Sequence, residues 1–238
     1  MLGSAAIAQT DAVLTMQDGT QRQVKVHGML PGGTSVEIGT PDGTGKIGLS
    51  VATIKAVTMA APAELQTAIT AFQQKNYDAA LAGLKKVNDK YAGMPANWAQ
   101  QAASTIGLVY IAKGDVAGAD ASFKAFQRLY PGQGSTLGDV GMGLVAIARK
   151  DFETAKIKLA PVAEQALKSK NVTQDTALAF SQTFLGLGQI KEAEGKYSEA
   201  LEDYLRTVTL FYHDRTAAAL AQEKADALRK AHKDVTVP

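Results

Sequence analysis

The chain has 238 residues, of which 46% are hydrophobic, so it is long enough to bury a sizeable core. Its 25 lysines and arginines nearly balance 23 aspartates and glutamates, and the resulting charge of +2 gives no overall field that would attract nucleic acid or an anionic membrane. The sequence contains no cysteine, which excludes disulfide bonds, thiolate nucleophiles and cysteine metal ligands.

The first ten residues, MLGSAAIAQT, allow two interpretations. Ala6, Ile7 and Ala8 form the small-x-small pattern that precedes a signal-peptidase cut, but a basic start and most of the apolar length are missing. Residues 1–10 are therefore either a signal-peptide remnant or a disordered terminus. The first interpretation predicts a periplasmic or exported protein, and the second leaves it cytoplasmic. Since no run of about 18 apolar residues occurs, we expect no membrane span.

Residues 11–59 have the pattern of short β-strands. Asp18 and Gly19 supply a hairpin turn between AVLTM and QRQVKVHGM, where valines alternate with polar residues. Glycine-rich turns then separate TSVEIG, KIGLS and TIKAVTM. About five strands within about fifty residues predict a small β-barrel domain over 11–59. In strand number and spacing this segment resembles the SH3-like and Sm-like barrels.

The predicted barrel offers one alternative function, the binding of a glycan or a nucleic acid with the rest of the chain as a spacer. Residues 10–59 carry four acidic and four basic side chains and no aromatic one. Proteins that bind single strands usually stack the bases on aromatic side chains in a basic groove. The composition therefore argues against nucleic acid. The segment DGTGKIG at 42–48 is explained by a hairpin turn rather than by a nucleotide site.

Residues 60–238 have a helical pattern with an internal repeat. After AAPA at 60–63, apolar residues recur every three or four positions, which indicates amphipathic helices. Four times, an aromatic or aliphatic residue stands three positions before an alanine. The distance along the chain from one such alanine to the next is typical of stacked helical hairpins. The four pairs are Tyr77 with Ala80, Val116 with Ala119, Phe152 with Ala155, and Tyr197 with Ala200.

The repeat resembles the tetratricopeptide repeat (TPR) family over about residues 61–214. The second copy carries the family's glycine, tyrosine, alanine, phenylalanine and proline in order: Gly107, Tyr110, Ala119, Phe123 and Pro131. The resemblance implies an α-solenoid of four TPR-like hairpins, and Asp214 can begin a capping helix after the last of them. The predicted fold class is α+β, mainly α.

The sequence does not predict a catalytic site. Its three histidines are far apart, and none has a metal-ligand spacing to another. His213 and Asp214 are either the start of an acid/base site or a helix boundary with a capping aspartate, and we favour the boundary. The glycine-rich segment at 132–143 lacks the Gly-Lys-Ser/Thr ending of a phosphate loop. We therefore predict a protein that is not an enzyme, with no cofactor and no metal.

The resemblance also implies a binding surface, because the first helices of such hairpins line a concave groove. The inward positions are mostly apolar, without the Lys, Arg and Asn of family members that clasp acidic tails. We therefore predict a protein partner, as a peptide or helix on an apolar groove, unless neighbouring helices cover it. The predicted groove residues are Leu65, Ile69, Phe72, Leu108, Ile111, Leu144, Ile147 and Leu185.

The predicted function is a protein-protein interaction scaffold, in an envelope complex if the chain is exported. A homo-oligomer is compatible with the sequence. Trp98 is either an anchor for the partner or a packing residue at a repeat junction, and we favour packing.

Overall fold

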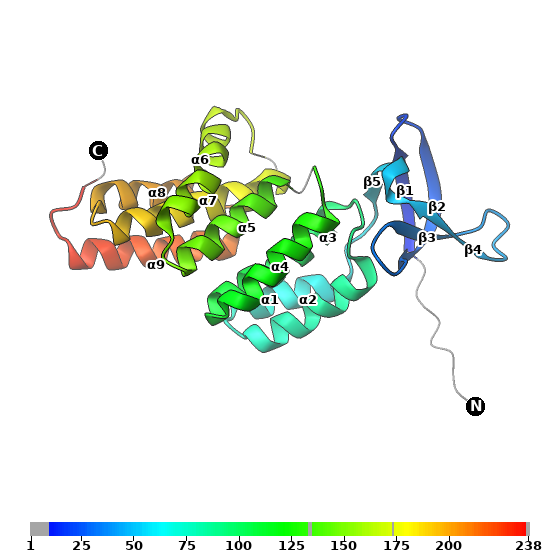
Figure 1. Cartoon of the computed structure of the whole chain (residues 1–238), viewed down its shortest axis with the longest axis horizontal. Helices are drawn as coiled ribbons and strands as arrows, with labels where there is room; N and C mark the ends of the chain where they lie inside the picture. Colours follow the sequence, from blue (N-terminus) through cyan, green and yellow to red (C-terminus); the bar gives the residue numbers. More distant parts are fainter. Residues whose placement is uncertain (1–9, 133–134, 173, 237–238) are drawn as a thin grey trace. The chain divides into compact units, whose positions relative to one another are not determined.

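The computed structural model describes residues 10–132, 135–172 and 174–236 (Figure 1). The stretch over 1–10 that resembles a signal remnant lies outside these residues, apart from Thr10. The described chain is mainly helical with an N-terminal antiparallel sheet, as predicted. It divides into two compact units: Met1–Ile106 with Arg128–Pro131, and Gly107–Gln127 with Gly132–Pro238.

The N-terminal segment forms a five-stranded sheet with the strand order β4-β3-β2-β1-β5. The prediction of a closed barrel is wrong, because β4 and β5 are not hydrogen-bonded to each other and form the two edges of the sheet. Closure would also require the outer edge of β5 to be free, but there the N–H of Val57 donates to the carbonyl of Pro95 at 2.7 Å. The strands are β1 (Thr10–Met16), β2 (Gln21–Met29), β3 (Ser35–Gly39), β4 (Lys46–Ser50) and β5 (Ile54–Thr58), with a short 3-10 turn η1 (Val51–Thr53) before β5.

The sheet packs against the end of the first helical hairpin within the first unit. Alternate residues such as Leu14 and Val36 are fully buried, as expected for a sheet with one covered face. A side chain at Gly28 would meet the carbonyl of Lys90, and one at Gly93 would meet the carbonyl of Gly33. The two segments thus touch backbone to backbone. The predicted domain boundary near residue 60 concerns independent folding and stays a prediction.

The helices follow the predicted repeat closely. Each second helix of a hairpin begins at the aromatic or aliphatic residue of the repeat signature, and each signature alanine is completely buried. The first helices are α1 (Ala63–Gln73), α3 (Asn97–Lys113), α5 (Ser135–Ala148) and α7 (Gln174–Ala193), and the second helices are α2 (Tyr77–Tyr91), α4 (Val116–Leu129), α6 (Phe152–Lys168) and α8 (Tyr197–Thr209). The last described helix, α9 (Arg215–Ala231), begins after Asp214 as expected.

The four turns inside the hairpins share one backbone conformation. Two positions before each second helix, a residue has a positive φ: Lys75, Gly114, Lys150 and Gly195. The next residue donates its N–H to the carbonyl five positions earlier, as Asp151 does to Ala146 at 2.9 Å. This is the Schellman ending of a helix, in which the left-handed position favours glycine.

We expect Lys150→Gly to stabilise the chain by about 0.5 to 1 kcal/mol, because lysine is strained at a φ of 61° and glycine is not. The reverse change, Gly195→Lys, places lysine at a φ of 76° and should destabilise by a similar amount. Urea unfolding of both variants checks the pair. Effects of the same sign for the two changes would contradict the argument.

A glycine on the first helix and a large side chain on the second form the seam of each later hairpin. A Cβ at Gly107 would lie 2.5 Å from the ring of Phe123, and one at Gly188 would lie 2.5 Å from the ring of Tyr204. Leu159 lies against Gly143 in the same way. The helices can therefore approach closely only where the first helix has no side chain.

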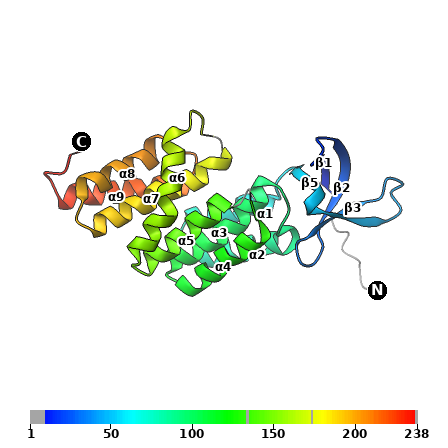
Figure 2. The same cartoon turned by 45° about the horizontal axis from the view of Figure 1, so that its top comes forward.

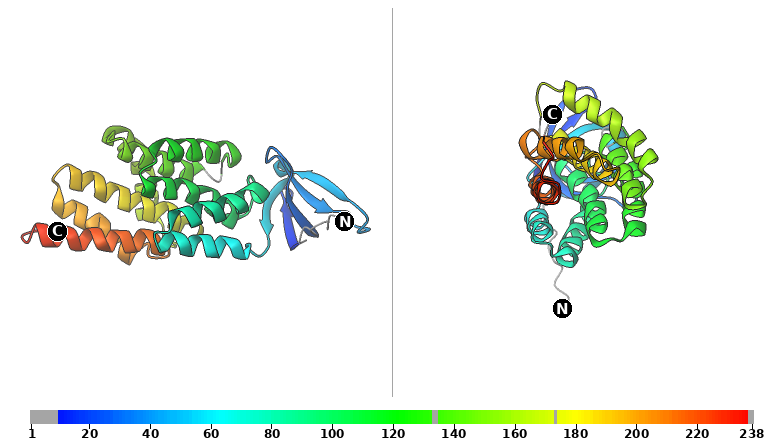
Figure 3. Two further views of the ribbon diagram at one scale, coloured as in Figure 1. Left: turned by 90° about the horizontal axis from the view of Figure 1, so that it is seen from below. Right: turned by 90° about the vertical axis from the view of Figure 1, so that its left-hand side faces the viewer.

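The hairpins of the second unit also contact one another in chain order. Helices α5 and α6 pack on α7, and α8 packs on α9 (Figures 2 and 3). The ring of Phe123 reaches beyond its own hairpin, because a Cβ at Gly141 of α5 would overlap it. A regular superhelix over the whole chain stays a prediction.

Candidate functional site

The groove residues predicted from the repeat are mostly buried. Leu65, Phe72, Leu108, Leu144 and Leu185 each expose less than a tenth of their surface, and Ile69, Ile111 and Ile147 are half-buried. The assignment of partner binding to these side chains stays a prediction, but five of the eight have little surface to offer a partner.

A neighbouring hairpin accounts for the burial in α5. A Cβ at Gly186 of α7 would lie 3.0 Å from Ile147 Cδ1 and 3.2 Å from Leu144 Cδ2. The missing side chain at Gly186 lets α7 cover these two residues. Leu185 lies in an apolar cluster with Leu201 and Leu228 of α8 and α9. Leu144, Ile147 and Leu185 therefore contribute to the packing between helices.

The other residues that the sequence singled out have structural roles. Asp214 caps α9 by accepting the backbone N–H groups of Thr216 and Ala217. The His213 ring stacks instead on Tyr212, with ring centroids 4.4 Å apart. Trp98 packs edge-on against Tyr91 at 5.0 Å, which agrees with packing rather than with an anchor.

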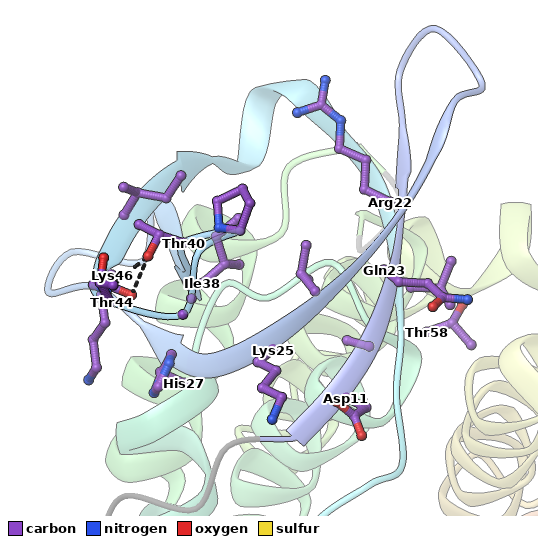
Figure 4. A pocket seen from close by; sticks show the side chains of 18 residues that line it. Asp11, Arg22, Gln23, Lys25, His27, Ile38, Thr40, Thr44, Lys46 and Thr58 are labelled. Atoms are coloured by element: carbon purple, nitrogen blue, oxygen red, sulfur yellow. Dashed lines mark hydrogen bonds between the residues drawn. The ribbon is translucent and has the colours of Figure 1, made fainter.

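The sheet carries an open hollow that the sequence analysis did not predict (Figure 4). Its volume is about 1130 Å³, and strands β1 to β5 and the β3–β4 turn all contribute to its lining. Figure 4 shows Lys25 in the middle, with Thr44 and Lys46 to one side and Gln23 to the other. Three cationic side chains, Arg22, Lys25 and Lys46, and one anionic one, Asp11, line it.

The strand register explains why Asp11, Lys25 and Lys46 lie close together. Lys25 pairs with Asp11 across β1 and β2, and Lys46 pairs with Gly39 across β3 and β4. The β2–β3 register places Gly39 beside Lys25, so the four residues form one row on one face of the sheet. A Cβ at Gly39 would lie 3.7 Å from Lys25 Cβ and 3.8 Å from His27 Nε2. Because Gly39 has no side chain, the floor between Lys25 and Lys46 is open.

The charges of the hollow are only partly compensated. Lys46 forms an ion pair with Glu37 at 3.1 Å, whereas no ion pair within the described residues involves Arg22 or Lys25. Close to the hollow, hydrogen bonds from the hydroxyls of Thr40 and Thr44 lower the pKa of Asp42 to about 2. Asp42 is thereby fixed as an anion that holds the β3–β4 turn.

The sequence contained a signal for this site, namely the alternation of strand residues. The alternation places Lys25 and Lys46 each on one face of its own strand. That the two lysines lie in one row on the same face of the sheet depends on how four strands pair. Within the described residues, no group of three or more His, Cys, Asp or Glu side chains is arranged to hold a metal ion. The hollow offers positively charged side chains and backbone groups.

None of the helices in the described parts of the chain is long and apolar enough to cross a membrane. No known family model, no curated protein and no solved structure matches the chain.

Proposed function

We propose that the chain is a non-enzymatic protein-binding scaffold that holds its partner on the N-terminal sheet. The observation that carries the proposal is the contrast in access: five of the eight predicted groove side chains are buried, whereas the hollow on the sheet is open. The TPR-like hairpins are then the rigid base that carries the sheet. If the chain is exported, assembly of an envelope complex is the corresponding role.

The chemistry of the hollow favours a protein over a polymer of bases or sugars. Its lining contains charged groups, threonines and glycines, and no Phe, Tyr or Trp on which a base or a sugar ring could stack. The exposed strands offer backbone groups that suit a second polypeptide.

Site-specific photo-crosslinking in extracts of the native organism tests the proposal. A photoreactive phenylalanine analogue replaces Gln23 in the hollow, Ile111 on a first helix, or Ile157, which is 72% exposed on α6 and serves as the control. We expect a defined protein adduct from position 23 alone. An adduct from position 111 instead would return the function to the groove, and absence of an adduct at position 23 would contradict the sheet proposal.

A further inference from the structure

The two edges of the sheet differ in how they are protected. The edge at β5 is partly covered, because Val57 donates its outward N–H to Pro95, and the pairing of β1 with β5 is interrupted by a bulge between Thr15 and Met16. Bulges and covering loops are the usual means by which proteins prevent an edge strand from pairing.

The edge at β4 lacks both of these protections among the described residues. Its pairing with β3 is regular from Gly39 with Lys46 to Ser35 with Ser50, and every residue of β4 is exposed or half-buried. Ile47 keeps 48% of its surface exposed. A regular and exposed edge strand presents a row of backbone groups to which another strand can add.

Two hydrogen bonds at the ends of the β3–β4 pair determine which groups point outward. Thr40 donates to the carbonyl of Gly45, and Val51 donates to the carbonyl of Thr34. Because bonded and non-bonded pairs alternate in an antiparallel ladder, Ile47 and Leu49 bond to β3. The N–H groups of Lys46, Gly48 and Ser50 then point to the open side. The carbonyls of Lys46 and Gly48 do so too, whereas the Ser50 carbonyl accepts the hydroxyl of Thr53.

We propose that β4 is the docking edge for an extended, acidic segment of the partner protein, which adds to the sheet as a sixth strand. The inference rests on the proposed function and names the ligand chemistry of the same site. The strand would satisfy the outward groups of β4, and an apolar residue would lie beside Ile47. Its acidic residues would lie on the face of the sheet that carries Lys46 of β4 and, in the same row, Lys25, which has no ion pair among the described residues.

Peptide addition to the full chain tests the inference by NMR. The probe is a capped peptide of alternating glutamate and valine, and its counterpart carries lysine in place of glutamate. With about 90% of the chain bound, hydrogen exchange of the Lys46, Gly48 and Ser50 amides should slow by about tenfold, because only the free fraction exchanges. The lysine peptide at the same concentration, on the order of 1 mM, should leave these amides unchanged.

Two variants separate the contribution of the backbone hydrogen bonds to peptide binding from the contribution of the charged side chains. Gly48→Pro removes one outward N–H and should weaken binding of the glutamate peptide by at least about tenfold. Lys25→Gln with Lys46→Gln keeps the backbone and should weaken binding several-fold, also if the proline variant fails to fold. The matched control is Lys230→Gln with Lys233→Gln, which changes the net charge equally at two exposed lysines far along the chain and should bind as the unchanged protein does.

Several results would overturn the inference. They are unchanged exchange at β4 with the glutamate peptide, equal slowing by the lysine peptide, or equal slowing by a short deoxythymidine oligonucleotide. Slowing that appears without peptide and grows with protein concentration would show that a second copy occupies the edge. If crosslinking at position 23 succeeds while the peptide fails, the scaffold function stands and only the ligand class is wrong.

Discussion

Replacing Gly141 by alanine is expected to destabilise the second compact unit by about 3 kcal/mol, the upper end of the usual cost of overpacking. The new Cβ would overlap the ring of Phe123, which is 1% exposed and already lies against Gly107. Neither helix can move aside without opening one of the two seams that the ring fills. Urea unfolding followed by circular dichroism measures the loss.

Gly138→Ala is the matched control, since it lies one turn earlier on the same helix. Its Cβ would meet only the flexible side chain of Gln127, and alanine favours the helix. We expect a change within about 0.5 kcal/mol. In a double-mutant cycle, Phe123→Leu should remove much of the cost of Gly141→Ala. Simple additivity of the two changes would show that the ring is not the obstacle.

Asp214→Ala is the second change expected to have a large effect, at about 3 kcal/mol. The alanine removes the cap of α9, worth about 1 kcal/mol. It also leaves the buried Ser181 hydroxyl and Gln182 amide without the carboxylate oxygen that now accepts both, at 3.1 and 2.9 Å. The Ser181 hydroxyl can still donate to the carbonyl of Leu178 at 3.1 Å, so the main loss is the Gln182 donor, and an unpaired buried donor costs about 1 to 3 kcal/mol.

Asp151→Ala measures the capping part of that cost alone. Asp151 caps α6 through the N–H of Thr154 at 3.1 Å, but it is exposed and holds no second helix. Its removal should cost only about 1 kcal/mol, measured by thermal and urea unfolding. Equal losses at positions 151 and 214 would mean that the contacts to α7 contribute nothing.

Asp214 should also give the chain a pH dependence. Burial raises the pKa of its carboxyl above the usual 3.8, against the opposing effect of its hydrogen bonds. A pKa that is higher in the folded state favours the folded, protonated form, so this contribution is complete below about pH 4 and is lost as the pH rises through the folded value. Relative to Asp214→Asn, which stays neutral, the unchanged chain should lose stability as the pH rises above the usual value of 3.8 and through the higher folded value. Parallel curves for the two proteins would contradict this.

The sequence predicted those features that depend on neighbouring residues. The starts of the second helices, such as Tyr77 and Tyr197, follow from a local turn and a 3.6-residue apolar period. The seam between Gly188 and Tyr204 follows from spacing within one hairpin. The cap at Asp214 is likewise a local signal, because a short acidic side chain bonds the next turn.

The features that the sequence did not predict depend on contacts between distant segments. Whether the sheet closes depends on β4 meeting β5, and Val57 is instead held by Pro95, which lies in the loop after α2. The sequence around Leu144 and Ile147 is the same whether these side chains are open or covered. They are covered because Gly186, in another hairpin, lets α7 approach them. Lys25 and Lys46 come to lie in one row only when four strands pair in the observed register.

The unequal edges of the sheet also determine what kind of assembly the strands permit. A filament of identical chains grows head to tail, so it needs two different complementary edges that are both free. Here the N–H of Val57 on the β5 edge is bonded to Pro95, so among the strands that the structure describes only β4 keeps an uninterrupted free edge. Addition at β4 therefore stops after one event, as either one bound segment or one symmetric pair. The protein can leave a strand open to other chains without the risk of endless polymerisation through its own sheet.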